Sequence, residues 1–185
     1  MKIYQAKIVP LNEQAIGTAA HGSAVFIIND DQLTIHIEMF DTPANLQHWE
    51  HFHGFPDGKA AAIATNAQDV NHDGFVDLPE TSAVSGTTMV PFDAAPHEMN
   101  IPNDNYPISD ANGYFAYTKV VPLAALNSQF KATFDDGELA LDKRIIYIHG
   151  VTDDVDLPDT VAGAVGHYST PVSYTHLTLP TICSV

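Results

Sequence analysis

The chain is poor in basic residues. Lys and Arg together number 7 against 23 Asp and Glu, which gives a formal net charge of −16. A field of this sign repels phosphate groups, so we exclude nucleic acids and anionic lipid surfaces as partners. It attracts cations, which is compatible with metal binding and equally with a soluble secreted protein that resists association.

The sequence also lacks an apolar run long enough to span a bilayer. Residues 1–4 are strand-like rather than the start of a signal peptide, so we expect either a cytoplasmic protein or one whose leader lies outside this sequence. The 185 residues suffice for one domain with a sizeable core, and we find no internal repeat and no linker that would divide it.

Cysteine is nearly absent, and the C-terminal segment holds the single exception. Residues 172–185 resemble the translation of a sequencing-library adaptor, and Cys183 lies among them. We therefore interpret residues 172–185 as an artefactual tail and predict a single β-domain over residues 1–171, whose native C-terminal strand we expect to be lost. Residues 1–171 contain no cysteine, so the sequence does not indicate a redox compartment.

Short apolar runs separated by turn residues dominate residues 1–171. Apolar and polar residues alternate at 32–40, and Asn29-Asp30-Asp31 predicts a tight turn from a strand at 22–28 into this one. Further strands are expected at residues 2–11, 48–54, 87–92, 114–121 and 139–149, and one helical turn at 122–126. This pattern predicts an all-β fold, a sandwich or a Greek-key barrel.

Residues 54–85 interrupt the strands with a long insertion of polar and small residues, which predicts a functional or metal-organised segment. Within it, residues 69–80 match the EF-hand loop pattern, with Gly74 at the sharp turn. The expected calcium ligands, by side chain or by backbone carbonyl, are Asp69, Asn71, Asp73, Phe75, Asp77 and Glu80. Pro79 leaves little room for a long exit helix, so we interpret the loop as structural. The alternative is an acidic, solvated loop.

Three of the ten histidines fall within residues 48–53. In a strand, the side-chain period of two points His51 and His53 to the same face. Two imidazoles on one face form half of a site for copper, zinc, iron or nickel, and we predict His149, at the end of the last strand, as the third ligand. His48 faces the other way and is either a fourth ligand reached by a bend or a surface histidine.

The remaining histidines and aromatic residues near these runs receive structural interpretations. We expect packed or exposed histidines at His21, His36 and His167. We expect core or sheet-face aromatic residues, which could also keep water from a metal, at Trp49, Phe52 and Tyr147.

The two histidine runs resemble the copper/zinc superoxide dismutase family. There a strand ends in His-x-His before a turn with Gly and Asp, as at 51–58, and a later apolar strand ends in a copper-ligand histidine before an Asp-Asp turn, as at 142–154. The layout is also similar to CHRD-domain proteins and to a bacterial extracytoplasmic group that carries His-Gly-Phe-x-Asp-Gly and an acidic insertion. The resemblance implies a Greek-key barrel with copper-type ligands His51, His53 and His149. Together with the calcium loop, it implies a periplasmic or secreted protein.

The chain departs from the superoxide dismutase pattern between the two runs. That family has a bridging histidine and a zinc subloop of histidines and an aspartate, whereas this interval offers only His72 and His97. A zinc site of that kind is therefore doubtful, and calcium would order the long loop instead. The cations available to guide an anion are few: Lys119, Lys131, Lys143 and Arg144.

Two functions follow as hypotheses. The first is an extracytoplasmic metal-binding β-domain of the CHRD type, stabilised by calcium and without turnover. The second is a copper-dependent superoxide dismutase in which the three histidines cycle the metal between two oxidation states. The missing bridging histidine and the few basic residues favour the first, and whether the protein is an enzyme stays open. A hydrolase has little support, because no serine lies in a nucleophile-elbow pattern.

Overall fold

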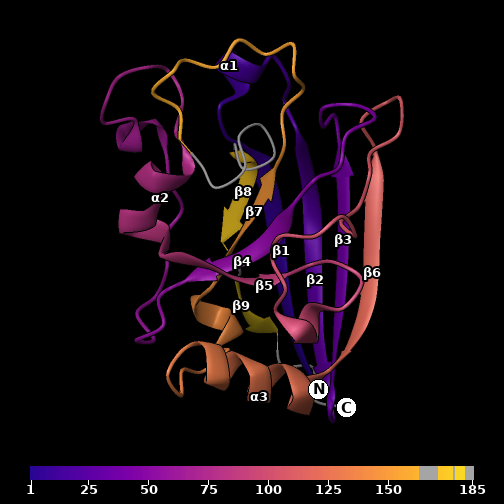
Figure 1. The fold of residues 1–185 in the computed structure, drawn as a ribbon. Helices are drawn as coiled ribbons and strands as arrows, with labels where there is room; N and C mark the ends of the chain where they lie inside the picture. The colour runs from indigo at the N-terminus through magenta and orange to yellow at the C-terminus, as the bar shows by residue number, and fades with distance from the viewer. Residues whose placement is uncertain (163–170, 177, 182–185) are drawn as a thin grey trace.

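A computed structural model of the chain describes residues 1–162, 171–176 and 178–181. Within these residues the chain is mainly β (Figure 1), as predicted. Its strands are β1 (Lys2–Pro10), β2 (His21–Asn29), β3 (Gln32–Phe40), β4 (Glu50–Gly54), β5 (Thr87–Pro91), β6 (Phe115–Pro122), β7 (Ile145–His149), β8 (Pro171–His176) and β9 (Thr178–Thr181). The expectations for His167 and Cys183 lie outside the described residues.

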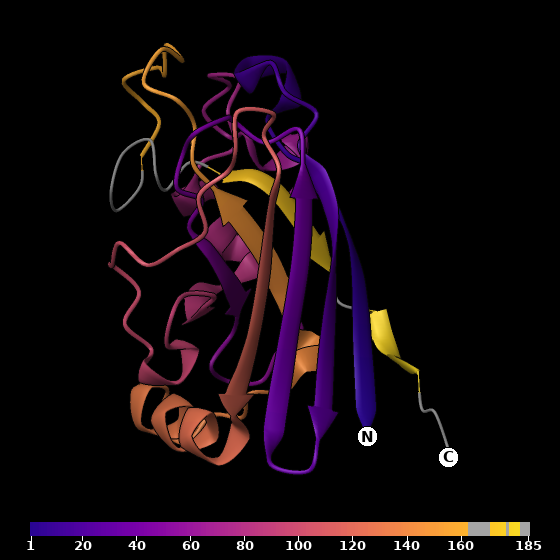
Figure 2. The same cartoon turned by 90° about the vertical axis from the view of Figure 1, so that its right-hand side faces the viewer.

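The strands form two antiparallel sheets that share β1. The strand order is β5-β4-β7-β8-β1-β2-β3-β6, and β9 also pairs with β1. Figure 2 shows the long strands β1, β2, β3 and β6 in front, with β7 and β8 crossing behind them. Among the described residues no pairing joins β5 to β6, so the sheets do not close into a barrel there. The all-β class is therefore confirmed, and the Greek-key barrel stays a prediction.

The β2–β3 hairpin has the register expected from its turn. Asn29 lies opposite Gln32, and Asp30 has a φ of 51°, which a short polar side chain tolerates. Alternate side chains of β3 are fully buried in the core: Leu33, Ile35, Ile37 and Met39. The apolar residues that alternate along the sequence of β3 are therefore the residues that alternate as buried positions in the structure.

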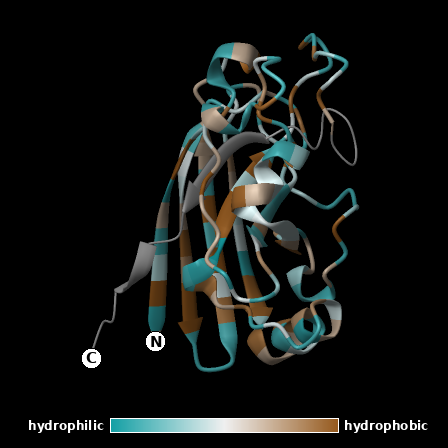
Figure 3. Cartoon of the chain, turned by 90° about the vertical axis from the view of Figure 1, so that its left-hand side faces the viewer, coloured by the Kyte–Doolittle hydropathy of each residue, from teal (hydrophilic) through white to brown (hydrophobic). Residues whose placement is uncertain are grey.

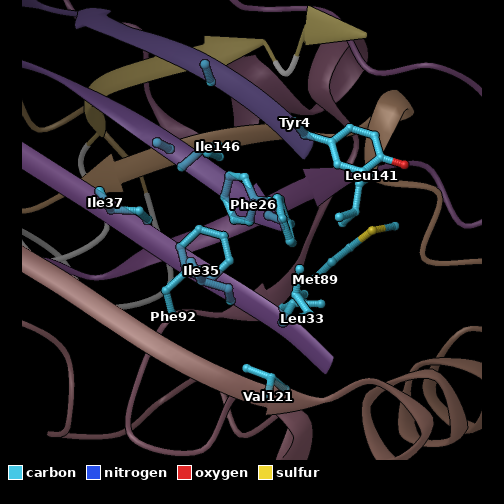
Figure 4. Packing of buried hydrophobic residues seen from close by; sticks show 14 of the residues in the cluster. Tyr4, Phe26, Leu33, Ile35, Ile37, Met89, Phe92, Val121, Leu141 and Ile146 are labelled. Carbon is cyan, nitrogen blue, oxygen red and sulfur yellow. The ribbon is translucent and has the colours of Figure 1, made fainter. Parts of the chain in front are cut away.

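An aromatic group holds the core face of β4 against the long strands (Figure 4). The ring centroid of Phe52 is 4.9 Å from that of Phe26 and 4.7 Å from that of Phe92, and all three side chains are fully buried. Burying a phenylalanine contributes roughly 1.5–3 kcal/mol. Since Phe52 points into the core, its neighbours His51 and His53 point to the opposite face of β4.

The helices are short and lie outside the sheets. They are α1 (Glu13–Ile16), α2 (Leu78–Ser85), α3 (Leu123–Thr133) and the 3-10 turns η1 (Asn66–Gln68), η2 (Pro96–Glu98) and η3 (Leu141–Lys143). The expected single turn at 122–126 is the start of α3, which continues because Leu126 and Phe130 bury one face against the core. In the described part of the chain no helix has the length and apolar character needed to cross a membrane.

The insertion at 54–85 covers the second face of β4 and β7. Its residues Ala61, Ala64 and Val76 form a buried cluster with Ile145 and Tyr147 of β7. Figure 3 shows many apolar residues along the strands, whereas the loops carry hydrophilic and apolar residues in alternation. The histidine face therefore lies between a sheet and a covering segment rather than on an open surface.

Strands β8 and β9 lie almost wholly within the segment that we interpret as adaptor-derived. β8 pairs with β7 and with the end of β1, and β9 pairs with β1. Backbone N–H and C=O groups at a sheet edge can pair with any extended segment, whatever its side chains. The strand pairing therefore does not distinguish a native C-terminal segment from an adaptor-derived one at residues 172–185.

Candidate metal centre

The structure brings together the three histidines that the sequence predicted to share a site. His51 and His53 come from β4 and His149 ends β7, and all three side chains are buried. Each offers one ring nitrogen, and these nitrogens all lie within 4.8 Å of one another. Three buried imidazoles at this spacing could hold a metal ion.

Strand pairing explains how residues about a hundred positions apart meet. β4 and β7 are antiparallel neighbours, with His51 opposite Tyr147 and His53 opposite Ile145. His149 lies two residues beyond Tyr147, so it points to the same face. The ring centroids of His51 and His149 are 5.3 Å apart, and those of His53 and His149 are 5.8 Å apart.

The ring nitrogens of His51 and His53 divide into two roles. The Nε2 atom of His51 is 2.9 Å from the Tyr106 hydroxyl, and that of His53 is 3.4 Å from the Thr88 hydroxyl. The Nδ1 atoms of both rings are buried and have no hydrogen-bond partner among the described residues. Metal-ligating histidines show this division, with one nitrogen on the ion and the other on a hydrogen-bonding group.

Burial controls the charge of these rings. Desolvation, together with the neighbouring His149, lowers the pKa of both His51 and His53 well below the ordinary value. Neutral imidazoles are the form that binds metals. At a metal–nitrogen distance of 2.0–2.1 Å the ligand nitrogens of a tetrahedral site would be about 3.3–3.4 Å apart, so a contraction of the cluster is needed to fit copper or zinc.

Aromatic side chains surround the three histidines, as expected from the sequence. The Tyr147 ring meets the His53 ring edge-on at 4.7 Å, and the Tyr147 hydroxyl is 2.7 Å from the Ser85 hydroxyl of α2. Trp49, Phe52 and Tyr147 are all buried. Trp49 and Tyr147 lie beside the histidine rings, with the Trp49 and His51 ring centroids 6.3 Å apart, whereas Phe52 packs in the core on the other face. Tyr147 also joins the insertion to the site.

His48 lies outside the histidine cluster and is fully buried. Its Nδ1 atom is 2.8 Å from the His149 carbonyl oxygen, and its Nε2 atom is 3.0 Å from the Pro43 carbonyl oxygen. The surface interpretation of this residue is therefore wrong, because its ring is fully buried between the carbonyl oxygens of Pro43 and His149. Gly150 allows this approach: its φ is 108°, and an added Cβ would lie 3.3 Å from the His48 Nδ1 atom.

The acidic loop at 69–80 has the expected turns. It runs from the end of η1 into the first turn of α2. Gly74 has a φ of 90°, and Val76 is buried in the cluster with Tyr147. Asp77 caps α2, since its Oδ1 atom accepts from the Glu80 amide at 3.0 Å. Phe75, the predicted carbonyl ligand, has a buried side chain.

Several side-chain oxygens of the acidic loop accept hydrogen bonds from backbone amides of the same loop. The two carboxylate oxygens of Asp69 accept from the amides of Asp73 and Gly74, each at 3.1 Å. Glu80 accepts from the Val70 amide at 2.9 Å and from the Asp77 amide at 3.1 Å. Further acceptors toward loop amides are Asn71 and Asp73.

The acidic loop therefore differs from the histidine cluster as a candidate site. In the part of the chain that the structure describes, its carboxylates do not form a group of three as close as the histidine nitrogens. Calcium binding at residues 69–80 stays a prediction.

The remaining predicted residues lie away from the cluster. His21 and His36 are exposed, as expected, and His72 is also exposed, whereas His97 is half-buried. Arg144, one of the suggested guiding cations, is fully buried and donates to the carbonyl oxygens of Phe55, Glu138 and Leu139. The Arg144 side chain therefore connects backbone segments through hydrogen bonds and is not available to guide an anion.

Sequence reasoning missed the hydroxyl groups that contact the ligand rings. Thr88 lies on β5, opposite His53, and a strand pairing would have been needed to find it. Tyr106 lies in the irregular segment between β5 and β6, where composition does not indicate which side chains point inward. A comparison of the chain with models of protein families finds no match, and a comparison with curated proteins finds no relative.

Proposed function

We propose that this protein is a β-domain that binds a transition metal, copper or zinc, through His51, His53 and His149. The main support is that three buried ring nitrogens, held by a pair of neighbouring strands, lie within 4.8 Å of one another. Two of the rings keep a buried Nδ1 atom without a partner among the described residues, and a bound ion would satisfy both. Three protein nitrogens leave a coordination position for water or a small ligand.

The resemblance to CHRD-domain and superoxide dismutase-like barrels belongs to this proposal. It is supported by the antiparallel sheets and by the adjacency of β4 and β7, which carry the two histidine runs on which the resemblance rests. An extracytoplasmic location, periplasmic or secreted, follows from the same resemblance.

A structural calcium site at residues 69–80 is the second part of the proposal. The ligand spacing, the positive φ of Gly74 and the position of Glu80 in the first turn of α2 support it. Calcium would compete with the backbone amides that now bind Asp69 and Glu80, so we expect weak affinity, in the millimolar range of extracellular sites.

The alternative function is a copper-dependent superoxide dismutase. A site of three imidazoles is compatible with redox-active copper. The burial of Arg144 removes one of the few cations that could attract superoxide, so we place metal binding without turnover first.

Metal content, measured by elemental mass spectrometry, tests the proposal. The full chain is purified without chelator, loaded with copper or zinc and freed of excess metal, beside His51→Ala, Glu80→Ala and the exposed control His36→Ala. We expect one equivalent of transition metal in the wild type, in His36→Ala and in Glu80→Ala, but not in His51→Ala. Calcium is measured separately, by equilibrium dialysis against millimolar calcium with no step that removes free ion, and should bind to the wild type, His51→Ala and His36→Ala but not to Glu80→Ala.

Each part of the proposal can fail separately. A wild type without transition metal after loading rejects the histidine site. Equal calcium content in the wild type and Glu80→Ala rejects the calcium loop. A copper-loaded protein that removes superoxide no faster than its His51→Ala variant rejects the dismutase alternative.

A further inference from the structure

The irregular segment between β5 and β6 contributes one side chain that contacts a ligand ring. Tyr106 is buried, its ring is roughly perpendicular to the His51 ring with centroids 5.3 Å apart, and it stacks on the Trp49 ring at 5.4 Å. Two aromatic neighbours therefore fix the position of the Tyr106 hydroxyl group.

The hydrogen bonds of that hydroxyl have a defined direction. The Tyr106 hydroxyl donates its only proton to the Ile101 carbonyl oxygen, at 2.6 Å. It can therefore only accept from His51, whose Nε2 atom is 2.9 Å away. This requires the proton of the neutral His51 ring to be on Nε2, which leaves the Nδ1 atom with a lone pair.

We propose that Tyr106 is a positioning residue, which holds the His51 ring with Nε2 protonated and thereby presents Nδ1 to the metal. This inference rests on the proposed metal site and adds the ligand atom and the group that selects it. Tyr106 acts through His51 and does not bind the ion, since its hydroxyl lies on the opposite ring nitrogen.

The same segment also reaches His149, which supports its role in organising the site. The Ser109 hydroxyl donates to the Pro43 carbonyl oxygen at 2.7 Å and lies 3.3 Å from the Nε2 atom of His48. His48 in turn contacts the His149 carbonyl oxygen. Tyr106 thus contacts the ring of one ligand, and Ser109 of the same segment lies beside the His48 ring, whose Nδ1 atom is near the backbone carbonyl of a second ligand.

Tyr117 offers a matched control for Tyr106. The Tyr117 hydroxyl also donates to a backbone carbonyl oxygen, that of Asp93, at 2.8 Å. Burial raises the pKa of both tyrosines, so both hydroxyls stay protonated. A change of either tyrosine to Phe removes one hydroxyl and one bond to the backbone, but only Tyr106 has a hydrogen bond with a ligand ring.

The test measures zinc affinity by competition with a chromophoric chelator for the wild type, Tyr106→Phe and Tyr117→Phe. We expect Tyr106→Phe to bind zinc about 10–100-fold more weakly, the range for the loss of a group that orients a ligand, and Tyr117→Phe to match the wild type. Equal affinity of Tyr106→Phe and wild type would overturn the inference. Equal weakening in both variants would also overturn it, because it would indicate a general loss of packing.

A metal-free measurement separates this inference from the proposed function. In nitrogen-15 spectra of the metal-free wild type, assigned with His51→Ala, we expect a His51 ring signal with the proton on Nε2 and slow exchange with water. Its absence from the wild type contradicts the proposal even if Tyr106→Phe fails to fold. If the signal is present but the wild type binds no zinc, the proposed function fails while the hydrogen bond stands.

Discussion

The histidine cluster and the acidic loop are both candidate cation sites, but they differ in what their donor atoms already bind. The Nδ1 atoms of His51 and His53 are buried without a partner among the described residues. The carboxylate of Asp69 accepts hydrogen bonds from two backbone amides, and that of Glu80 from three. Ligand types at the right spacing therefore indicate a site, but the existing hydrogen bonds of those atoms determine how much a metal would stabilise it.

The carboxylates near the histidine cluster and in the acidic loop also differ in their hydrogen bonding. Glu50, next to His51 in sequence but on the other face of β4, is fully buried, and neither of its oxygens has a hydrogen-bond partner among the described residues. Burial raises its pKa well above the ordinary value. The loop carboxylates have many partners, and the carboxylate of Glu50 has none within this part of the chain.

Among the changes considered, removal of His149 is expected to have the largest effect, a loss of zinc affinity. His149→Ala deletes one of three ligands, so we expect zinc affinity to fall more than about a hundredfold, beyond the range for loss of an orienting group. Chelator competition measures this change, with His36→Ala as the control. A loss below tenfold would mean that His51 and His53 bind zinc without His149.

The sequence predicts the ligand set because alternation along a strand is a local rule. His51 and His53 share a face for that reason alone, and a strand that ends in His149 was the natural partner. The buried alternation of β3 and the tight turn at Asp30 follow from the same local patterns. Features of this kind depend on neighbouring residues only.

The sequence does not predict features that depend on distant contacts. α3 extends past its predicted turn because its buried face meets the core and because Asp31 accepts from the amides of Leu123 and Ala124. His48 is buried because three separated segments converge on it. Tyr106 contacts His51 across 55 positions, through a segment without periodicity.

Replacement of Glu50 is expected to stabilise the protein at neutral pH. The folded pKa of Glu50 lies above its ordinary value of 4.5, so at pH 7 folding must either protonate this group or bury its charge. Below about pH 4.5 the carboxyl is neutral in both states and this penalty disappears. Glu50→Gln, which is neutral at every pH, should therefore unfold at higher urea concentration than the wild type at pH 7.

The stability difference between Glu50→Gln and the wild type should depend on pH. The advantage of Glu50→Gln should shrink as the pH falls toward 4.5, and the exposed control Glu98→Gln should show little change at either pH. A Glu50→Gln protein less stable than wild type at pH 7 would indicate that the Glu50 carboxylate has a compensating partner.

Glu80→Ala is expected to act on the acidic loop alone. The change leaves the amides of Val70, Asn71 and Asp77 without their acceptor, so we expect a loss of about 1–2 kcal/mol in the free energy of unfolding, comparable to loss of a helix cap. Urea unfolding without calcium measures this loss, with Glu98→Ala as the control. Millimolar calcium should raise the melting temperature of the wild type but not of Glu80→Ala.

Ser85→Ala tests the connection between the two regions and has the smallest expected effect. The Ser85 hydroxyl contacts the Ala62 carbonyl oxygen at 2.9 Å and the Tyr147 hydroxyl at 2.7 Å, and Tyr147 packs on His53. Loss of this buried group should cost about 1 kcal/mol of stability and change zinc affinity by only a few fold. Ser82→Ala, which removes an exposed hydroxyl that donates to the Pro79 carbonyl oxygen of the same helix, should change neither. If Ser85→Ala leaves both quantities at wild-type values, the insertion covers the histidine face without contributing to its geometry, and the two regions are independent.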